Sequence, residues 1–99
     1  MPTHNPSRVT LSQGAATVTS INLGNGANTD VVVTLEQAQP DANYEVAYSF
    51  SGLSATILGN TTRSVLSKTA STVTVRLHNN ALLGLSVGFT VLVTAYRNA

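Results

Sequence analysis

Apolar residues alternate with small polar residues along three segments in the second half of the chain. Successive side chains of a β-strand point to opposite faces of the sheet, so a spacing of two places every second residue on one face. The alternating apolar positions are Tyr44, Val46, Tyr48 and Phe50, then Val73, Val75 and Leu77, and finally Val87, Phe89, Val91 and Val93. The pattern predicts three strands that turn these residues toward a shared interior.

Turn-forming residues divide the remainder of the chain into further short segments. Residues 24–28 form a strong turn, because their Asn-Gly pair can adopt positive φ angles. Residues 62–67 and 72–78 are predicted to pair antiparallel, and residues 86–97 to form the longest strand. Glycine, asparagine or clustered β-branched residues interrupt every candidate helix, so none is expected. Seven or eight short strands with frequent turns predict an all-β fold, a single antiparallel β-sandwich.

The chain is predicted to form one domain preceded by an arm. Residues 1–12 begin with Met-Pro-Thr-His-Asn-Pro and are expected to be an extended or mobile arm, while residues 13–99 form the sandwich. The apolar positions of residues 15–23 change parity midway, which a β-bulge near Thr19 or Ser20 would accommodate. Three leucines in the loop before the last strand are expected to plug one end of the core: Leu82, Leu83 and Leu85.

The surface of this protein must be polar but almost uncharged. Only 9% of the 99 residues are charged and the net charge is +1, whereas about 25% are charged in ordinary soluble proteins. The basic residues are scattered singly, without the basic stripe of a nucleic-acid binder, so no nucleic-acid partner is expected. An uncharged polar surface suits close packing inside an assembly, and it equally suits recognition of neutral, hydroxyl-rich ligands such as sugars.

Cofactors, metals and membranes are not expected partners. The chain contains no cysteine, which excludes disulfides and thiolate metal sites, and no other plausible set of metal ligands is present. The first residues lack the apolar run of a signal peptide, and no segment approaches the length of a transmembrane helix. A fold without disulfides fits synthesis in a reducing cytoplasm.

From about Val31 onward, four segments follow one another in an order typical of a known family. They are the strand Tyr-Glu-Val-Ala-Tyr-Ser-Phe-Ser at 44–51, the Lys-Thr-Ala-Ser-Thr-Val-Thr-Val segment at 68–75, the polar pair Asn79-Asn80, and the closing strand at 87–95. This arrangement resembles the small β-sandwich modules of bacteriophage tail fibres, tailspikes and related adhesins, which are similar to H-type lectins. The tryptophan that often occurs in the closing strand of these modules is absent here.

The resemblance implies a non-enzymatic virion structural protein that is assembled in the bacterial host cytoplasm. The family is usually homotrimeric, so the expected partners are copies of the same chain, other virion proteins and host cell-surface glycans. Two alternatives stay open. One is a capsid-decorating head protein without sugar binding, and the other is a stand-alone, lectin-like adhesin that binds carbohydrate.

The best candidate for ligand binding is a polar cluster at the end of the second alternating segment. Arg76, His78, Asn79 and Asn80 offer the guanidinium, imidazole and amide groups that match the hydroxyls of a neutral sugar. The same pattern also fits an ordinary turn at Asn79-Asn80 that follows an exposed histidine at a strand end.

The last strand is expected to carry a subunit interface. Leu92 and Tyr96 lie on the face opposite Phe89, Val91 and Val93, and they are more apolar than a solvent-exposed face requires. A domain of this length also leaves much apolar surface uncovered when it is alone. We therefore expect a homotrimer held partly through Leu92 and Tyr96, with core packing as the alternative role of these side chains.

No catalytic arrangement is recognisable in the sequence. The chain has no Gly-x-Ser-x-Gly nucleophile motif and no His-Glu-x-x-His motif. Neither of the two histidines, His4 and His78, has an adjacent carboxylate. The carboxylates Asp30, Glu36, Asp41 and Glu45 could pair as in a glycosidase, but Glu36 and Glu45 alternate with apolar neighbours, as residues on the solvent face of a strand do. An enzyme is not expected.

Overall fold

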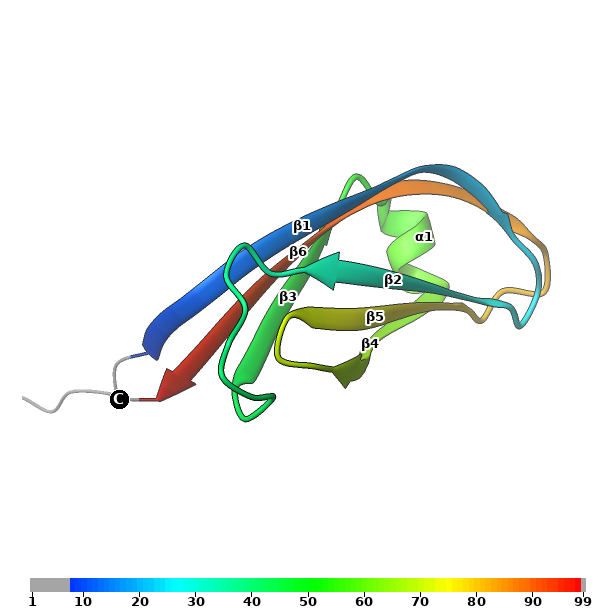
Figure 1. The fold of residues 1–99 in the computed structure, drawn as a ribbon. Helices are drawn as coiled ribbons and strands as arrows, with labels where there is room; N and C mark the ends of the chain where they lie inside the picture. The colour runs from blue at the N-terminus through cyan, green and yellow to red at the C-terminus, as the bar shows by residue number, and fades with distance from the viewer. Residues whose placement is uncertain (1–7, 99) are drawn as a thin grey trace, which may run out of the picture.

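The computed structural model describes residues 8–98, and this range contains six strands and one short helix (Figure 1). The elements are β1 (Arg8–Leu23), β2 (Asn28–Thr34), β3 (Glu45–Ser51), α1 (Ala55–Gly59), β4 (Thr61–Lys68), β5 (Thr72–Asn79) and β6 (Leu85–Asn98). The strands form two antiparallel sheets of three strands each, which confirms the predicted all-β sandwich.

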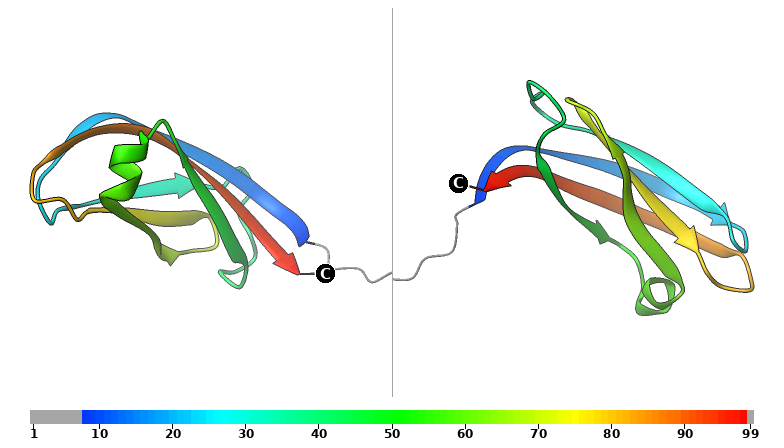
Figure 2. Two further views of the ribbon diagram at one scale, coloured as in Figure 1. Left: turned by 180° about the vertical axis from the view of Figure 1, so that it is seen from behind. Right: turned by 90° about the horizontal axis from the view of Figure 1, so that it is seen from below.

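The two sheets are built around central strands that come late in the sequence. Sheet 1 has the order β1-β6-β3, and sheet 2 has the order β2-β5-β4. The predicted antiparallel pairing of β4 with β5 is confirmed, with Val65 opposite Val75. Figures 1 and 2 show β1 and β6 as a long curved pair that arches over sheet 2.

Six strands form in the described residues, fewer than the seven or eight expected. β1 is one continuous strand of 16 residues, and it, rather than the 14-residue β6, is the longest. The segment after Gly52 contains α1, although no helix was expected. The hydroxyl of Ser54 accepts a hydrogen bond from the N–H of Ile57 at 3.3 Å, which caps this single helical turn.

The core between the sheets contains most of the alternating residues. Those that are buried as predicted are Tyr44, Val73, Val75, Leu77, Val87, Phe89, Val91 and Val93. Val31 and Val33 of β2 face the same interior, and Ala95 extends the buried row of β6. Val46 and Phe50 are partly buried against this core. The period of two therefore identified the inward faces of β5 and β6 correctly.

Tyr48 departs from the prediction, because 37% of it remains exposed. Its ring packs edge-to-face on Phe50, with centroids 6.1 Å apart, and its hydroxyl donates a hydrogen bond to the carbonyl of Arg63 in β4 at 3.0 Å. The residue points to the correct side of its strand. However, β3 lies at the border of sheet 1, where no further strand covers the ring.

A β-bulge lies in β1 where the parity of its apolar residues changes. Val18 pairs with Phe89 and Ile21 pairs with Val87, so Thr19 and Ser20 together face one residue of β6. That residue is Gly88, and a Cβ there would overlap the carbonyl oxygen of Thr19. The bulge expected near Thr19 or Ser20 is confirmed, and a glycine opposite makes room for it.

The predicted turn after β1 is also present. The N–H of Ala27 donates to the carbonyl of Gly24 at 3.0 Å, and Gly26 adopts a φ of 72°. This turn carries the chain from sheet 1 to sheet 2.

The predicted arm of residues 1–12 is too long. Arg8 pairs with Asn98 and Val9 with Arg97, so the strand begins at Arg8 and residues 8–12 belong to the sandwich. Ser12 is buried, and its hydroxyl accepts the N–H of Gln37 at 2.9 Å. The remainder of the predicted arm lies outside the described residues.

Two of the three leucines expected to plug the core do not do so. Leu82 is 88% exposed and Leu83 is 77% exposed, whereas Leu85 is packed partly against the core. Leu23, at the end of β1, is buried instead. The loop carrying Leu82 and Leu83 is held through its backbone, since the Leu83 carbonyl accepts the side-chain amide of Asn79 at 3.0 Å.

Candidate functional site

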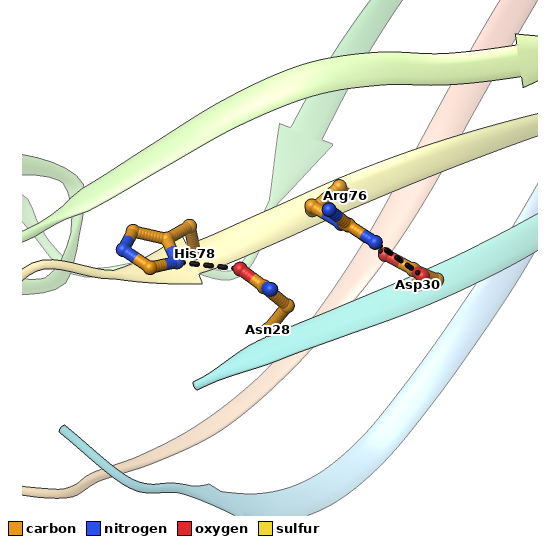
Figure 3. Close-up of polar contacts among 4 residues, drawn as sticks. All are labelled: Asn28, Asp30, Arg76 and His78. Carbon is orange, nitrogen blue, oxygen red and sulfur yellow. Dashed lines mark hydrogen bonds and ion pairs between the residues drawn. The ribbon is translucent and has the colours of Figure 1, made fainter. Parts of the chain in front are cut away.

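Three of the four residues predicted to bind ligand lie on or beside the outer face of sheet 2. Arg76 and His78 alternate with the buried residues of β5, so both point away from the core, and Asn80 follows directly after the strand. The cross-strand register places Asp30 of β2 beside Arg76, and Asn28 beside His78 (Figure 3). The site therefore includes polar residues from β2 that the sequence had not connected with it.

Arg76 and Asp30 form a two-point ion pair. Arg76 donates from Nε to Oδ1 at 2.7 Å and from its second terminal nitrogen to Oδ2 at 3.0 Å. The hydrogen bond from Arg76 holds the pKa of Asp30 below its ordinary value, and the same bond raises the pKa of Arg76. Both side chains are partly exposed. The pair fixes the guanidinium plane on the sheet surface and engages Asp30, one of the carboxylates considered for catalysis.

His78 and Asn80 are also held by neighbouring strands. The Nδ1 of His78 lies 2.5 Å from the Oδ1 of Asn28, and an N–H at Nδ1 would donate to that oxygen. The amide of Asn80 donates to the hydroxyl of Thr62 in β4 at 2.5 Å. Thr62 of β4 also pairs with His78, on the side of β5 opposite to Asn28. Amide, imidazole and hydroxyl groups from three strand segments are thus fixed in one row.

Asn79 does not belong to this surface, which corrects its predicted role as a ligand-binding residue. It is completely buried, and its amide donates to the carbonyls of Leu23, Gly24 and Leu83 at 2.9 to 3.0 Å. Its side-chain oxygen accepts the N–H of Ala81 at 2.8 Å. The alternation along β5 turns this position inward. There, these hydrogen bonds engage both the amide nitrogen and the amide oxygen of the side chain.

The second predicted surface, around Leu92 and Tyr96, lies on the outer face of sheet 1. Leu92 is 47% exposed in the central strand and is flanked by Ala15 of β1 and Ser49 of β3. Tyr96 is partly buried and lies near the C-terminal end of β6, between Thr10 of β1 and Glu45 of β3. Both side chains point away from the core, so the predicted separation from Phe89, Val91 and Val93 is correct.

A shallow hollow of about 340 Å³ lies beside Leu92. Its walls are formed by outward-facing residues of all three strands, including Gln13, Ala47, Ser49 and Thr94. These small, uncharged side chains leave Leu92 as the main apolar projection of the face. Around Leu92 such a surface can be covered closely by another sheet, since the nearest charged side chain on the face is that of Glu45, beside Tyr96.

Nothing in the described part of the chain suggests a metal centre, because no three His, Asp or Glu side chains come together between residues 8 and 98. Within the same range, no helix is long and apolar enough to cross a membrane.

Comparison with known proteins found no matching family model, no similar curated protein and no similar solved structure. The geometry of the two outer faces is therefore the main guide to function.

Proposed function

We propose that this chain is a non-enzymatic structural protein of a bacteriophage virion. In this proposal it is a module of the tail-fibre or tailspike type, assembled in the bacterial host cytoplasm and packed against copies of itself and other virion proteins. The observation that carries the proposal is the outer face of sheet 1, where Leu92 projects between the small, uncharged residues Ala15 and Ser49. The resemblance of residues 31–95 to phage β-sandwich modules supplies the biological setting.

Self-association through this face has a clear energetic basis. Burial of apolar surface stabilises an interface by about 25 cal/mol per Å², and nearly half of Leu92 is available for burial. The flanking residues Ala15 and Ser49 are small enough to admit a partner sheet closely. The low overall charge removes the usual electrostatic barrier to association. We propose a homotrimer in which this face, with Tyr96 at its end, is covered.

Light scattering at micromolar concentration tests the assembly. We expect the mass of three chains, or of a multiple of three, for the native protein. Leu92→Asp should abolish the trimeric mass, because it would place a carboxylate in the interface. The matched control is Val32→Asp, which makes the same kind of change at a 58% exposed valine on the outer face of sheet 2 and should leave the mass unchanged.

Two results would contradict this proposal in different ways. A monomeric mass for the native chain would exclude self-assembly. A trimer that survives Leu92→Asp would retain the oligomer but reject this face as its interface.

Glycan binding is a second candidate function, and it is favoured by the polar row on sheet 2. Arg76, His78 and Asn80 present groups that are held in place before any ligand arrives, which lowers the entropic cost of binding. Neutral sugars bind through such planar donors and acceptors. In this reading, the outer face of sheet 2 contacts host surface glycans while the outer face of sheet 1 is buried in the assembly.

NMR titration with host surface oligosaccharides distinguishes this candidate from a purely structural or capsid-decorating role. We expect shifts confined to residues around His78 and a weaker affinity for His78→Ala. Asn22→Ala, which removes an exposed amide from β1, is the matched control and should bind as the native chain does. A capsid-decorating protein would bind virions and give no shifts with any sugar.

A further inference from the structure

Strand β3 is the least covered strand of the sandwich. It lies at the border of sheet 1 and pairs only with β6 (Figures 1 and 2). Among the six strands of residues 8–98, it alone has no buried residue, although Val46, Tyr48 and Phe50 face the core side. A border strand exposes a row of unpaired backbone N–H and C=O groups, which can accept another strand.

The other three border strands have features that hinder such pairing. β1 is interrupted by two irregularities in its register, and β4 has one as well as the charges of Arg63 and Lys68. β2 carries Asp30, and the chain just beyond it is tied to β1 through the Glu36 N–H, which donates to the Gln13 carbonyl at 2.8 Å. These are the devices by which natural sheets protect their edges.

β3 has almost none of this protection. Its seven residues pair with β6 without a register shift and include no proline. The only charge of the strand is that of Glu45, at its first position. A regular, nearly neutral edge of this kind is suited to the addition of a strand.

The sequence of β3 fits a second copy of itself in antiparallel orientation. If the pairing is centred on Tyr48, Val46 lies opposite Phe50 of the second copy, and cross-strand pairs of this kind stabilise a sheet. Glu45 then lies opposite Ser51, so the two carboxylates are at opposite ends of the contact. A parallel arrangement in register would instead bring the two glutamates together, and like charges in such positions repel.

We infer that two copies of this chain pair through β3, which joins their first sheets into one continuous sheet across a twofold axis. Such an axis stands perpendicular to the shared sheet, so both second sheets lie on the same side of it. This brings the border of β4 toward its copy. It would shelter Leu66, which is 48% exposed and lines a hollow with Val46 and Val65 between β3 and β4.

This contact is distinct from the proposed trimer interface and does not depend on it. The trimer uses the face of sheet 1 around Leu92, whereas the β3 contact uses its edge. If both exist, the edge contact links trimers in pairs; if the trimer does not form, it yields dimers. The occupant of the edge is in either case the same seven residues of a second copy.

Disulfide trapping tests the register directly, because the chain has no cysteine of its own. Antiparallel pairing centred on Tyr48 places residue 47 opposite residue 49 of the second copy, at a Cβ separation of about 4.5–5.5 Å. An oxidised mixture of Ala47→Cys and Ser49→Cys chains should therefore cross-link about tenfold more than either variant alone. Ser49→Cys mixed with Ser64→Cys, on the outer face of β4, is the control and should not cross-link.

Two further variants separate this inference from the trimer. Cross-linking of the mixture should persist when both chains also carry Leu92→Asp, because that change does not touch the edge. Tyr48→Lys should abolish it by placing two ammonium groups at the axis. Tyr48→Phe, which loses only the hydrogen bond to Arg63, should retain it.

The opposite results would overturn the inference. Cross-linking that disappears with Leu92→Asp would assign the contact to the face of sheet 1. Equal cross-linking in the mixture and in each variant alone would reject the antiparallel register. Backbone amides of residues 45–51 that exchange with solvent at the same rate in dilute and concentrated protein would show that no strand is added, and the edge would then be free for a different partner.

Discussion

The side-chain amide of Asn79 donates a hydrogen bond to the main-chain carbonyl of Leu23 at 2.9 Å, although 56 positions separate the two residues. The same amide also reaches Gly24 and Leu83. One buried side chain thus joins the end of β1, the turn after it and the loop that leads into β6. Because these hydrogen bonds tie three segments together around a buried amide, Asn79 is central to the stability of this end of the sandwich.

Asn79→Ala should lower the free energy of unfolding by about 2–4 kcal/mol, since it removes several buried or partly buried hydrogen bonds at once. Urea denaturation measures the loss. The control is Asn80→Ala at the next, exposed position, where we expect a change within about 0.5 kcal/mol. Equal effects of the two substitutions would contradict the structural role of Asn79.

Phe89→Ala should destabilise the fold by about 3–5 kcal/mol, because the ring is buried and its removal leaves a cavity. The ring lies 5.2 Å from that of Phe50, centroid to centroid, and only 3% of the residue is exposed. Leu92 lies in the same strand but points the opposite way. Leu92→Ala should therefore lower the unfolding free energy of the isolated chain by less than about 1 kcal/mol. Denaturation curves at low protein concentration compare them. A nearly neutral Phe89→Ala would mean that the faces of β6 are reversed.

Gly14→Ala should destabilise the protein by about 1–3 kcal/mol, as overpacking does. A Cβ at this position in β1 would overlap the carbonyl oxygen of Thr34 at the end of β2. Gly59→Ala serves as the control, because a Cβ there meets nothing within 4 Å. The midpoints of thermal unfolding should differ clearly between the two variants, and a fully stable Gly14→Ala would show that β1 and β2 are farther apart.

Tyr44 should make the fold sensitive to high pH. Burial raises the pKa of its phenol, whose hydroxyl donates to the carbonyl of Thr69 at 2.5 Å. The folded state therefore holds the proton more tightly than the unfolded state. This contribution is complete below the unfolded pKa of about 10 and is lost as pH rises through the folded value.

The measurement is the unfolding free energy of the native chain and of Tyr44→Phe between neutral and strongly alkaline pH. At neutral pH the variant should be weaker by about 1 kcal/mol, because it lacks one hydrogen bond. The difference should shrink as pH rises above 10. A constant difference across the whole range would mean that Tyr44 does not contribute to the alkaline transition.

The amino-acid sequence by itself determined the strand-forming segments and their inward faces. The alternation along β5 and β6 identified Val75 and Val91 as core residues, and the change of parity in β1 located the bulge near Thr19 and Ser20. These features could be predicted because they depend on neighbouring residues along one strand. A spacing of two has the same meaning wherever the strand is placed in the fold.

Only the tertiary structure decided how the segments meet. The pairing of Asp30 with Arg76 arises because β2 lies beside β5, which no local pattern indicates. Tyr48 is exposed because its strand is at a border, and the buried amide of Asn79 is paired because Leu23 and Gly24, far away in the sequence, supply acceptors. Strand order is set by the joint burial of both sheets, whose energy depends on contacts between residues far apart in the chain. For that reason the candidate surfaces could be named from the sequence, but their neighbours and their free edges could not.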